Sequence, residues 1–245
     1  MSSIYSIPEN HDVKLWRYLD FAKFVSLLDS RSLFFSRSDL LGDPHEFSYP
    51  KSNYKTFDGT PQSANNEFFL QTTKVLAKRI FVNCWHMNDH ESTAMWGQYS
   101  TRDNGLAIQS TYSRLRQALV TCEYRNRLDI GMVKYADYEE QVIIGQNVLE
   151  FIFHKRIQFS HEKELRAVIW EKTTNETLID PFAMAELDSA EPGLVIPVAL
   201  DSLIERIIVA PATPAWFSKL VESVCAKYDL KCPITQSVLG DPPLR

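Results

Sequence analysis

Strand-like apolar runs and helix-like amphipathic segments follow one another irregularly in this sequence, and that order limits the folds it can adopt. Without strict strand-helix-strand alternation, a doubly wound parallel sheet is disfavoured. The sequence therefore predicts an α+β fold: a single domain over 1–245 with a mixed or antiparallel, split sheet flanked by helices. Strands are expected at 14–19, 32–36, 79–85, 105–110, 131–138, 165–170, 193–200 and 205–210, and helices at 20–30, 92–100, 113–120, 140–156 and 214–230.

The sequence indicates where two of the expected helices begin. Asp20 is a candidate N-cap for the first. Thr213 is a candidate N-cap for the last, with Pro214 in its first turn. The buried stripe of the last helix is expected to consist of Phe217, Leu220, Val221, Val224 and Tyr228. A polar stretch at about 48–66 interrupts these patterns and is a candidate lid.

Composition excludes several classes of protein. The chain has 245 residues, no apolar window long enough for a membrane helix and no signal-peptide pattern, so we expect a soluble, cytoplasmic protein with no membrane partner. Its four cysteines form no CxxC pair. A formal net charge of −5 argues against nucleic-acid binding by bulk charge, although a local basic patch could still bind. Neither GxGxxG nor a phosphate-loop motif is present.

The stretch HEKELRAVIW at 161–170 places two carboxylates where a strand is expected to begin. Side chains two apart on a strand share a face, so Glu162 and Glu164 would point into one region of space. One interpretation is a solvated ladder in which both acids and Arg166 face water. The other is a cleft, where an acid orients a sugar hydroxyl and stabilises positive charge at an anomeric carbon.

Two further stretches carry polar residues without an obvious local role. The first, FFSRSDLLGDPHE, contains Ser36, Ser38, Asp43 and Glu46, and a capped turn would also explain it. The second, WHMNDHESTAMWGQYSTRDNG, contains Trp96 and Tyr99, whose helical spacing is equally typical of a core. Cys84, His86 and His90 have weak metal-ligand spacing, and histidines in a loop beside a site are the simpler interpretation.

Together these stretches resemble an uncharacterised bacterial family known as a domain of unknown function. Its pattern has an opening that ends in FSxxxDxxDPxE, a middle of the form MWxxYxxxxxG, and a late lysine followed by ExExR. The resemblance covers most of residues 14–210. The matching residues are Phe35, Ser36, Asp39, Asp43, Pro44 and Glu46, then Met95, Trp96, Tyr99 and Gly105, then Lys155, Glu162, Glu164 and Arg166.

The order of elements is also similar to ADP-ribosyltransferase-like domains, including the toxin type that modifies nucleic acid. In the arginine/serine/glutamate class of that fold, an arginine holds the NAD phosphate, a serine pair shapes the nicotinamide site and an ExE motif ends in the catalytic glutamate. By position, the resemblance implies Arg17 for the arginine, Ser36 and Ser38 for the serines, and Glu162 and Glu164 for the acids. Trp96 or Tyr99 would wall the nicotinamide, and Asp43, Glu46, Lys155 and Arg166 are further cleft candidates.

The resemblance implies a transferase that cleaves NAD, as substrate, and passes ADP-ribose to a nucleic acid or protein, without a metal. Such an enzyme would act as a bacterial toxin or anti-phage defence effector, with a neutralising or activating partner protein. One alternative is a non-enzymatic module that senses a nucleotide or a protein. Another is a phosphodiester hydrolase in which Asp39, Asp43, Glu46 and Glu164 hold a divalent cation.

Overall fold

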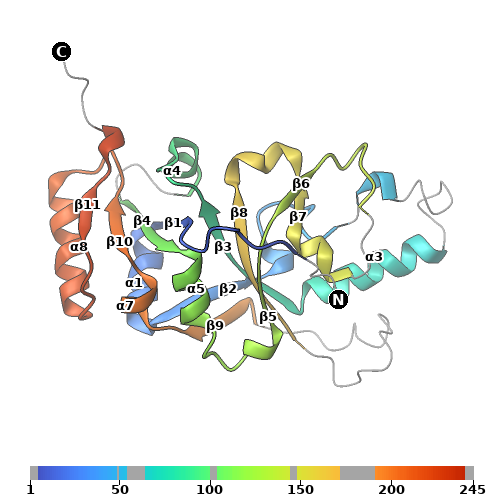
Figure 1. The fold of residues 1–245 in the computed structure, drawn as a ribbon, viewed down its shortest axis with the longest axis horizontal. Helices are drawn as coiled ribbons and strands as arrows, with labels where there is room; N and C mark the ends of the chain where they lie inside the picture. Colours follow the sequence, from blue (N-terminus) through green and yellow to red (C-terminus); the bar gives the residue numbers. More distant parts are fainter. Residues whose placement is uncertain are drawn as a thin grey trace, which may run out of the picture. The chain divides into compact units, whose positions relative to one another are not determined.

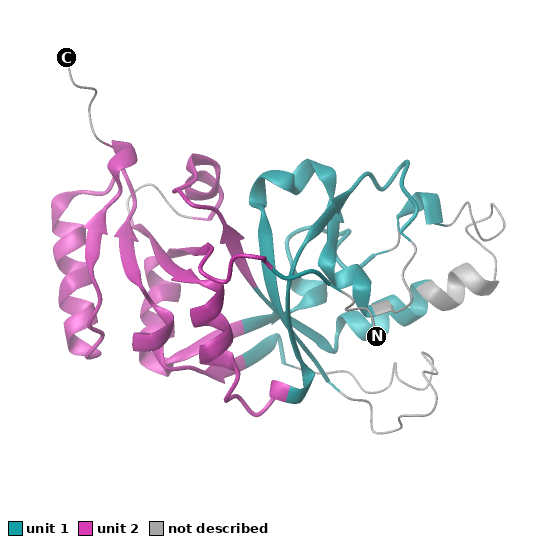
Figure 2. Ribbon diagram, viewed as in Figure 1, with its two compact units in different colours: residues 1–7, 35–83, 126–194 teal, residues 8–34, 84–125, 195–245 magenta. Residues whose placement is uncertain are grey.

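The structure, a computed structural model, describes residues 5–48, 50–53, 64–99, 104–143, 148–171 and 191–240. Its strands and helices mix in sequence, most strand pairs are antiparallel, and the predicted α+β class with a mixed sheet is confirmed (Figure 1). Contacts divide the chain into two compact units (Figure 2). Unit 1 comprises 1–7, 35–83 and 126–194, and unit 2 comprises 8–34, 84–125 and 195–245. Most of the predicted lid lies outside the described residues.

The sheet of unit 2 is built around β1 (Lys14–Asp20). This strand pairs along its whole length, antiparallel, with β4 (Gly105–Thr111), and near its start with the end of β3 (Ile80–Met87). Strand β4 in turn pairs antiparallel with β10 (Arg206–Val209), which pairs parallel with β11 (Ile234–Gln236). The strand predictions for β1, β4 and β10 are confirmed.

Helices cover this sheet, and the predicted caps have different outcomes. Asp20 accepts a hydrogen bond from Lys23 N and caps α1, as predicted. Thr213 does not cap α8, because the helix begins after Pro214 and the Thr213 hydroxyl donates to Ala210 O. Leu220, expected in the buried stripe, is 37% exposed. The helices of unit 2 are α1 (Phe21–Ser30), α4 (Thr93–Tyr99), α5 (Tyr112–Leu119), α7 (Leu200–Leu203) and α8 (Ala215–Lys227), followed by the 3-10 turn η5 (Val238–Gly240).

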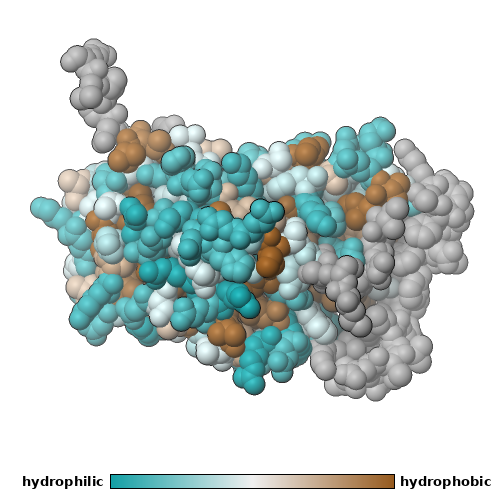
Figure 3. Space-filling view, in the orientation of Figure 1, coloured by the Kyte–Doolittle hydropathy of each residue, from teal (hydrophilic) through white to brown (hydrophobic). Residues whose placement is uncertain are grey.

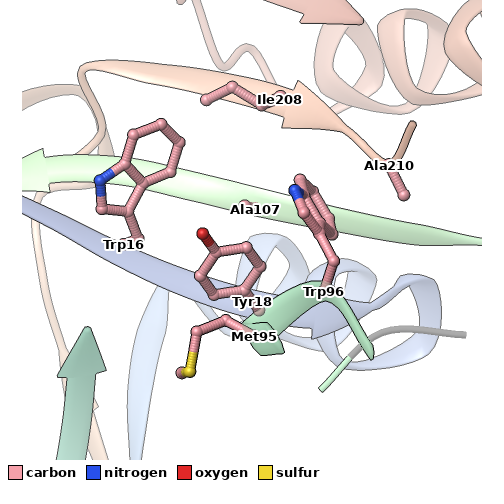
Figure 4. Packing of buried hydrophobic residues seen from close by; sticks show 7 residues of the cluster. All are labelled: Trp16, Tyr18, Met95, Trp96, Ala107, Ile208 and Ala210. Atoms are coloured by element: carbon pink, nitrogen blue, oxygen red, sulfur yellow. The ribbon is translucent and has the colours of Figure 1, made fainter. Parts of the chain in front are cut away.

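The core of unit 2 contains an aromatic cluster formed by β1, α4, β4 and β10 (Figure 4). The ring of Tyr18 meets that of Trp96 edge-on, with centroids 4.8 Å apart. The Trp16 indole donates to Asn88 O. Edge-to-face contacts of this kind add to the stability gained from burying the rings themselves. The cluster consists of Trp16, Tyr18, Met95, Trp96, Ala107, Ile208 and Ala210.

Unit 1 contains the other strand pairs. Strand β8 (Glu164–Trp170) pairs antiparallel with β5 (Leu128–Met132) and also pairs with β3. Strand β2 (Ser32–Arg37) pairs antiparallel with β3, and β9 (Gly193–Pro197) is its neighbour. A separate parallel pair is formed by β6 (Lys134–Ala136) and β7 (His154–Arg156). The chain passes between the units within β2, β3 and β9.

The helix predicted for 140–156 is wrong in the part that the structure describes. There the chain forms the 3-10 helix η3 (Val148–Phe153) and then β7. Phe151, Ile152 and Phe153 are consecutive and all buried, whereas an amphipathic helix would expose at least one of three consecutive residues to water. Unit 1 also contains α3 (Ala64–Ala77) and the 3-10 turns η1 (Ser38–Leu40) and η4 (Ile157–Glu162), and η2 (Arg125–Arg127) lies at the boundary between the units.

None of the helices among the described residues combines the length and the apolar character that crossing a bilayer requires. Figure 3 shows a face on which hydrophilic side chains predominate and apolar ones are scattered.

Candidate functional site

The two acids of the ExE motif lie on different elements. Glu162 is the last residue of η4 and Glu164 is the first of β8, so the prediction that both lie on one strand is wrong. Lys163, between them, has a left-handed backbone with φ of 40°. This joint turns the chain from the 3-10 helix into the strand. The carboxylates nevertheless converge, because both accept hydrogen bonds from Lys155 Nζ, at 2.5 Å for Glu162 and 3.5 Å for Glu164.

Arg166 holds Glu164 from the other side. Its Nε and Nη2 donate to the two oxygens of Glu164 at 3.0 and 2.9 Å, a bidentate pair, and its Nη1 donates to Ile152 O at 2.6 Å. Arg166 and Glu164 are two apart on β8 and share a face, which brings the guanidinium to the carboxylate. Bidentate arginine–carboxylate pairs are among the strongest and most directional contacts in proteins.

The DPHE loop joins the same cluster. Glu46 bridges its two cations: one oxygen lies 3.1 Å from Lys155 Nζ and the other 2.8 Å from Arg166 Nη2. Asp43 pairs with Arg156, the neighbour of Lys155 on β7, at 2.8 Å. The loop and the late motif of the sequence pattern therefore meet in unit 1. We call Glu46, Lys155, Glu162, Glu164 and Arg166 the acid cluster.

Burial excludes one of the two interpretations of the ExE stretch. Glu162 is 3% exposed, Glu164 6% and Arg166 0%, so the solvated ladder is wrong. Burial alone would lower the pKa of Lys155, but Glu164, Glu46 and Glu162 together outweigh it and raise that pKa above its ordinary value. The lysine is therefore an ammonium ion at neutral pH. Burying an isolated charge carries a large desolvation free energy, and the ion pairs between these acids and the two cations offset it here.

Two tyrosines and one arginine of this region were not predicted. The Tyr135 hydroxyl accepts a hydrogen bond from Glu164 N, and burial raises its pKa. The Tyr138 hydroxyl is buried near Glu46, and the part of the chain that the structure describes gives it no hydrogen-bond partner. Arg156 pairs with Asp43. In the sequence, only the position of Arg156 next to Lys155 could have indicated that it belongs to this region. The two tyrosines lie in a stretch whose pattern is that of an ordinary strand.

A hollow of about 450 Å³ lies in unit 1, and no residue of the acid cluster lines it. Tyr135 lines the hollow, and its hydroxyl accepts a hydrogen bond from Glu164 N at 2.8 Å. One side chain therefore lies between the hollow and the start of β8. Burial lowers the pKa of His154, another lining residue, whose Nδ1 lies 2.9 Å from Glu150 O. The lining residues are Lys134, Tyr135, Ala136, Gln141, Val142, Ile143, Glu150 and His154.

The two serines predicted to act as a pair lie in different environments. Ser38 is buried and its hydroxyl donates to Ala77 O at 2.7 Å, a contact that fixes η1 to the end of α3. Ser36 lies on β2 and is half-buried, with a long contact of 3.4 Å to Arg37 O. Asp39 pairs with Arg37 at 2.7 Å. Of the two serines, Ser36 is the more accessible.

Arg17 lies on β1 in unit 2, in a different environment. The residue is half-buried, and its guanidinium lies over the Trp85 ring, 5.9 Å from the centroid. Nη2 makes a long contact of 3.5 Å with Phe34 O, whereas Nη1 is buried and has no hydrogen-bond partner among the described residues. Burial lowers the pKa of Arg17 to about 10, and the nearby Cys84 acts in the opposite direction. The arginine is still a cation at neutral pH.

The predicted aromatic walls also lie in unit 2. Trp96 belongs to the aromatic cluster, is 6% exposed, and its indole donates to Glu91 Oε2 at 3.0 Å (Figure 4). Glu91 also accepts from the Ser237 hydroxyl, so Trp96 is fixed within the core. Tyr99, at the end of α4, is 44% exposed and remains the more accessible ring. The predicted site residues thus divide between the units, with Arg17, Trp96 and Tyr99 in unit 2 and the others in unit 1.

The structure offers no support for a metal centre in its described part. No group of three or more His, Cys, Asp or Glu side chains there could hold a metal ion, and this includes Cys84, His86 and His90. The acids proposed for a hydrolase already contact cations: Asp39 contacts Arg37, Asp43 contacts Arg156, and Glu46 and Glu164 contact the cations of the acid cluster.

Comparison by sequence finds no match, neither among protein-family models nor among curated proteins. Solved structures of Thermus sp. 2.9 DarT are similar over most of this chain. The complex with NAD+ has 7% identity and a TM-score of 0.43, covering 95% of this chain and 98% of that one. The complex with ADP-ribosylated ssDNA has 8% identity and a TM-score of 0.41, covering 94% and 95%. Because similarity at this level assigns no activity, the function rests on this chain's own residues.

Proposed function

We propose that the chain is an ADP-ribosyltransferase-like enzyme that cleaves NAD+ and transfers ADP-ribose to a macromolecule. The observation that carries the proposal is the convergence of Glu162 and Glu164 on Lys155, at the start of β8 and one side chain away from the hollow. The ExE motif and the order of elements resemble that class of enzyme. Arg17, with a buried N–H that has no partner among the described residues, adds a second and independent feature.

The chemistry of the reaction matches these residue types. When the bond between nicotinamide and ribose breaks, nicotinamide leaves with the bonding electrons and the ribose acquires cation character at its anomeric carbon. A carboxylate at that position stabilises the developing charge. We assign this role to Glu164, with Glu162 beside it. The acceptor's nucleophilic atom then bonds to the same carbon and loses its proton.

The remaining predicted residues are assigned to NAD+ itself. Arg17 would donate to the pyrophosphate, because its Nη1 needs an acceptor and a phosphate oxygen is a strong one. Ser36 and Ser38 are proposed to shape the nicotinamide site, and Tyr99 or Trp96 to wall it.

The proposal is tested by nicotinamide release from NAD+, measured for wild type and Glu164→Gln. The variant is expected to lose roughly 100-fold or more of the rate, as on removal of one group that stabilises a charged transition state. Glu205→Gln is the matched control, because Glu205 pairs with Lys14 on β1 in unit 2, far along the chain from the acid cluster. Full turnover by a folded Glu164→Gln protein would exclude the assignment.

A second candidate, a module that senses a nucleotide or protein without turnover, is favoured by one specific observation. Glu46, Glu162 and Glu164 all accept hydrogen bonds from buried cations, so the acids also serve as structure. NAD+ or another nucleotide that raises the melting temperature of the wild type without releasing nicotinamide would support it.

The acceptor and the biological role are proposals of the same kind. Acidic and basic residues balance in unit 2, so the formal net charge of −5 belongs to unit 1. A nucleic acid is therefore repelled less by unit 2 than by unit 1. We propose that a toxin or anti-phage effector of this design would take up a nucleic acid through unit 2. Label transfer from NAD+ carrying ³²P to single-stranded DNA, RNA or lysate protein distinguishes the acceptors.

A further inference from the structure

Lys155 occupies the centre of the acid cluster. Its ammonium group contacts three carboxylates, those of Glu46, Glu162 and Glu164, at 3.1, 2.5 and 3.5 Å. An ammonium group has three N–H donors, so one donor is available for each acid. We infer that Lys155 is a positioning residue for the proposed reaction: it holds Glu162 and Glu164 side by side in their charged form. This inference rests on the proposed function.

The surroundings of Lys155 fix its head group in place. The residue lies in the middle of β7, which pairs with β6 so that Tyr135 is its partner. The Phe159 ring lies on another side of the ammonium group, 4.7 Å from Nζ to the ring centroid. Lys155 is 7% exposed, so its charge is directed to the acids rather than to water. A buried head group held on several sides cannot follow a departing carboxylate far.

Charge explains why such a residue is needed. Two carboxylates that converge in a buried place repel each other, and each would take up a proton without a nearby cation. A protonated carboxyl group cannot stabilise a cation-like ribose. Arg166 donates to Glu164 with two donors, and Lys155 contacts both acids. Lys155 is thus the residue that joins the pair.

The next residue on the same strand provides a matched control. Arg156 is also a cation paired with a buried acid, Asp43, and it also lies over the Phe159 ring, with 5.3 Å between its Cζ and the ring centroid. Its ion pair does not involve the ExE acids. Replacing Lys155 or Arg156 by methionine removes one cation from one strand in each case, but only the first change reaches Glu162 and Glu164.

The test is the pH dependence of nicotinamide release by wild type, Lys155→Met, Lys155→Arg and Arg156→Met. In Lys155→Met we expect the acid limb of the profile to move upward by about 1–3 pH units, the range by which an opposite charge shifts a neighbouring carboxyl group. Lys155→Arg is expected to restore the wild-type limb, and Arg156→Met to leave it in place. A folded Lys155→Met protein with the wild-type profile would overturn the inference.

A second measurement separates this inference from the proposed function. If the wild type releases no nicotinamide, the proposed function fails. ¹³C NMR of the glutamate side chains still tests whether Lys155 keeps Glu162 and Glu164 charged. The carboxyl resonances of Glu162 and Glu164 are expected to shift at a higher pH in Lys155→Met than in wild type, and equal midpoints would overturn the inference. If Lys155→Met does not fold, Lys155→Gln combined with Glu46→Gln, which removes one charge of each sign, takes its place.

Discussion

Two arginines, Arg166 in unit 1 and Arg17 in unit 2, stand in opposite situations. Arg166 is fully buried, and its Nε, Nη1 and Nη2 donate to Glu164, Ile152 O and Glu46 at 2.6–3.0 Å. Arg17 has one long contact at 3.5 Å, and its buried Nη1 has no hydrogen-bond partner in the part of the chain that the structure describes. Both lie on strands, but Arg17 is half-buried and Arg166 fully buried.

The difference separates a cation that holds the fold from one that is available to a ligand. A buried donor without a partner costs about 1–3 kcal/mol. Nη1 of Arg17 finds no acceptor among the described residues, so a ligand that supplied one would remove this cost. Arg166 has its acceptors within the chain, and its removal would leave Glu164 and Glu46 short of a cation. The predictions below follow from this contrast.

The largest effect is expected for Arg166→Met. The change leaves the three buried carboxylates of the acid cluster with Lys155 as their cation, so the free energy of unfolding should fall by about 3–5 kcal/mol, the usual result of breaking a buried ion pair from one side. Arg17→Met removes a buried donor that has no partner among the described residues, but it also removes the contact of the guanidinium with the Trp85 ring. The two effects oppose each other, so the net change should be less than about 1 kcal/mol. Urea unfolding of both variants is the measurement. Equal losses of unfolding free energy in the two variants would contradict the contrast between Arg166 and Arg17.

A smaller effect is expected for Glu46→Gln. Lys155 and Arg166 each keep another carboxylate, so the loss should be about 1–3 kcal/mol. Glu205→Gln removes a carboxylate from a partly exposed pair with Lys14 and should cost no more than about 1 kcal/mol. The two variants are compared by the same unfolding experiment. A loss for Glu205→Gln as large as that for Glu46→Gln would show that burial of the acid cluster contributes nothing.

The smallest effect is a difference in pH dependence. The pKa of Arg17 is lowered to about 10, so above that pH the unfolded chain binds more protons than the folded one, and Arg17 makes stability rise with pH. The pKa of Lys155 is raised in the folded protein. Its contribution to the free energy of unfolding is therefore complete below the ordinary lysine pKa, and it is lost as the pH rises through the pKa of the folded state. Unfolding from pH 9 to 11 should give a less positive slope for Arg17→Met than for wild type. An unchanged slope would contradict the assignment.

Local pattern predicted much of the fold. Apolar runs located β1, β3 and β4, and Asp20 marked the start of α1, because strand alternation and a cap depend on neighbouring residues. The predictions that failed had competing local solutions. Pro214 rather than Thr213 precedes α8, and the apolar stretch at 148–153 forms a 3-10 helix instead of an α-helix.

The candidate site was predictable in its residue types but not in its contacts. The spacing of Glu162 and Glu164 indicated convergence, and the structure produces it through the left-handed Lys163 rather than along a strand. The contact of Glu46 with Arg166 joins residues 120 apart in sequence, which no local pattern can indicate. The unpartnered Nη1 of Arg17 likewise depends on what the fold places around it.

The most direct test of the contrast between the arginines is calorimetric binding of ADP-ribose to wild type and Arg17→Met at neutral pH. ADP-ribose has the pyrophosphate of NAD+ but no nicotinamide to lose, so binding is measured without cleavage. We expect the wild type to bind, and Arg17→Met to bind about tenfold or more weaker with an unchanged melting temperature, since a hydrogen bond to a charged group contributes about 1.5–3 kcal/mol. Equal affinity of the two proteins, or no binding by the wild type, would contradict the account.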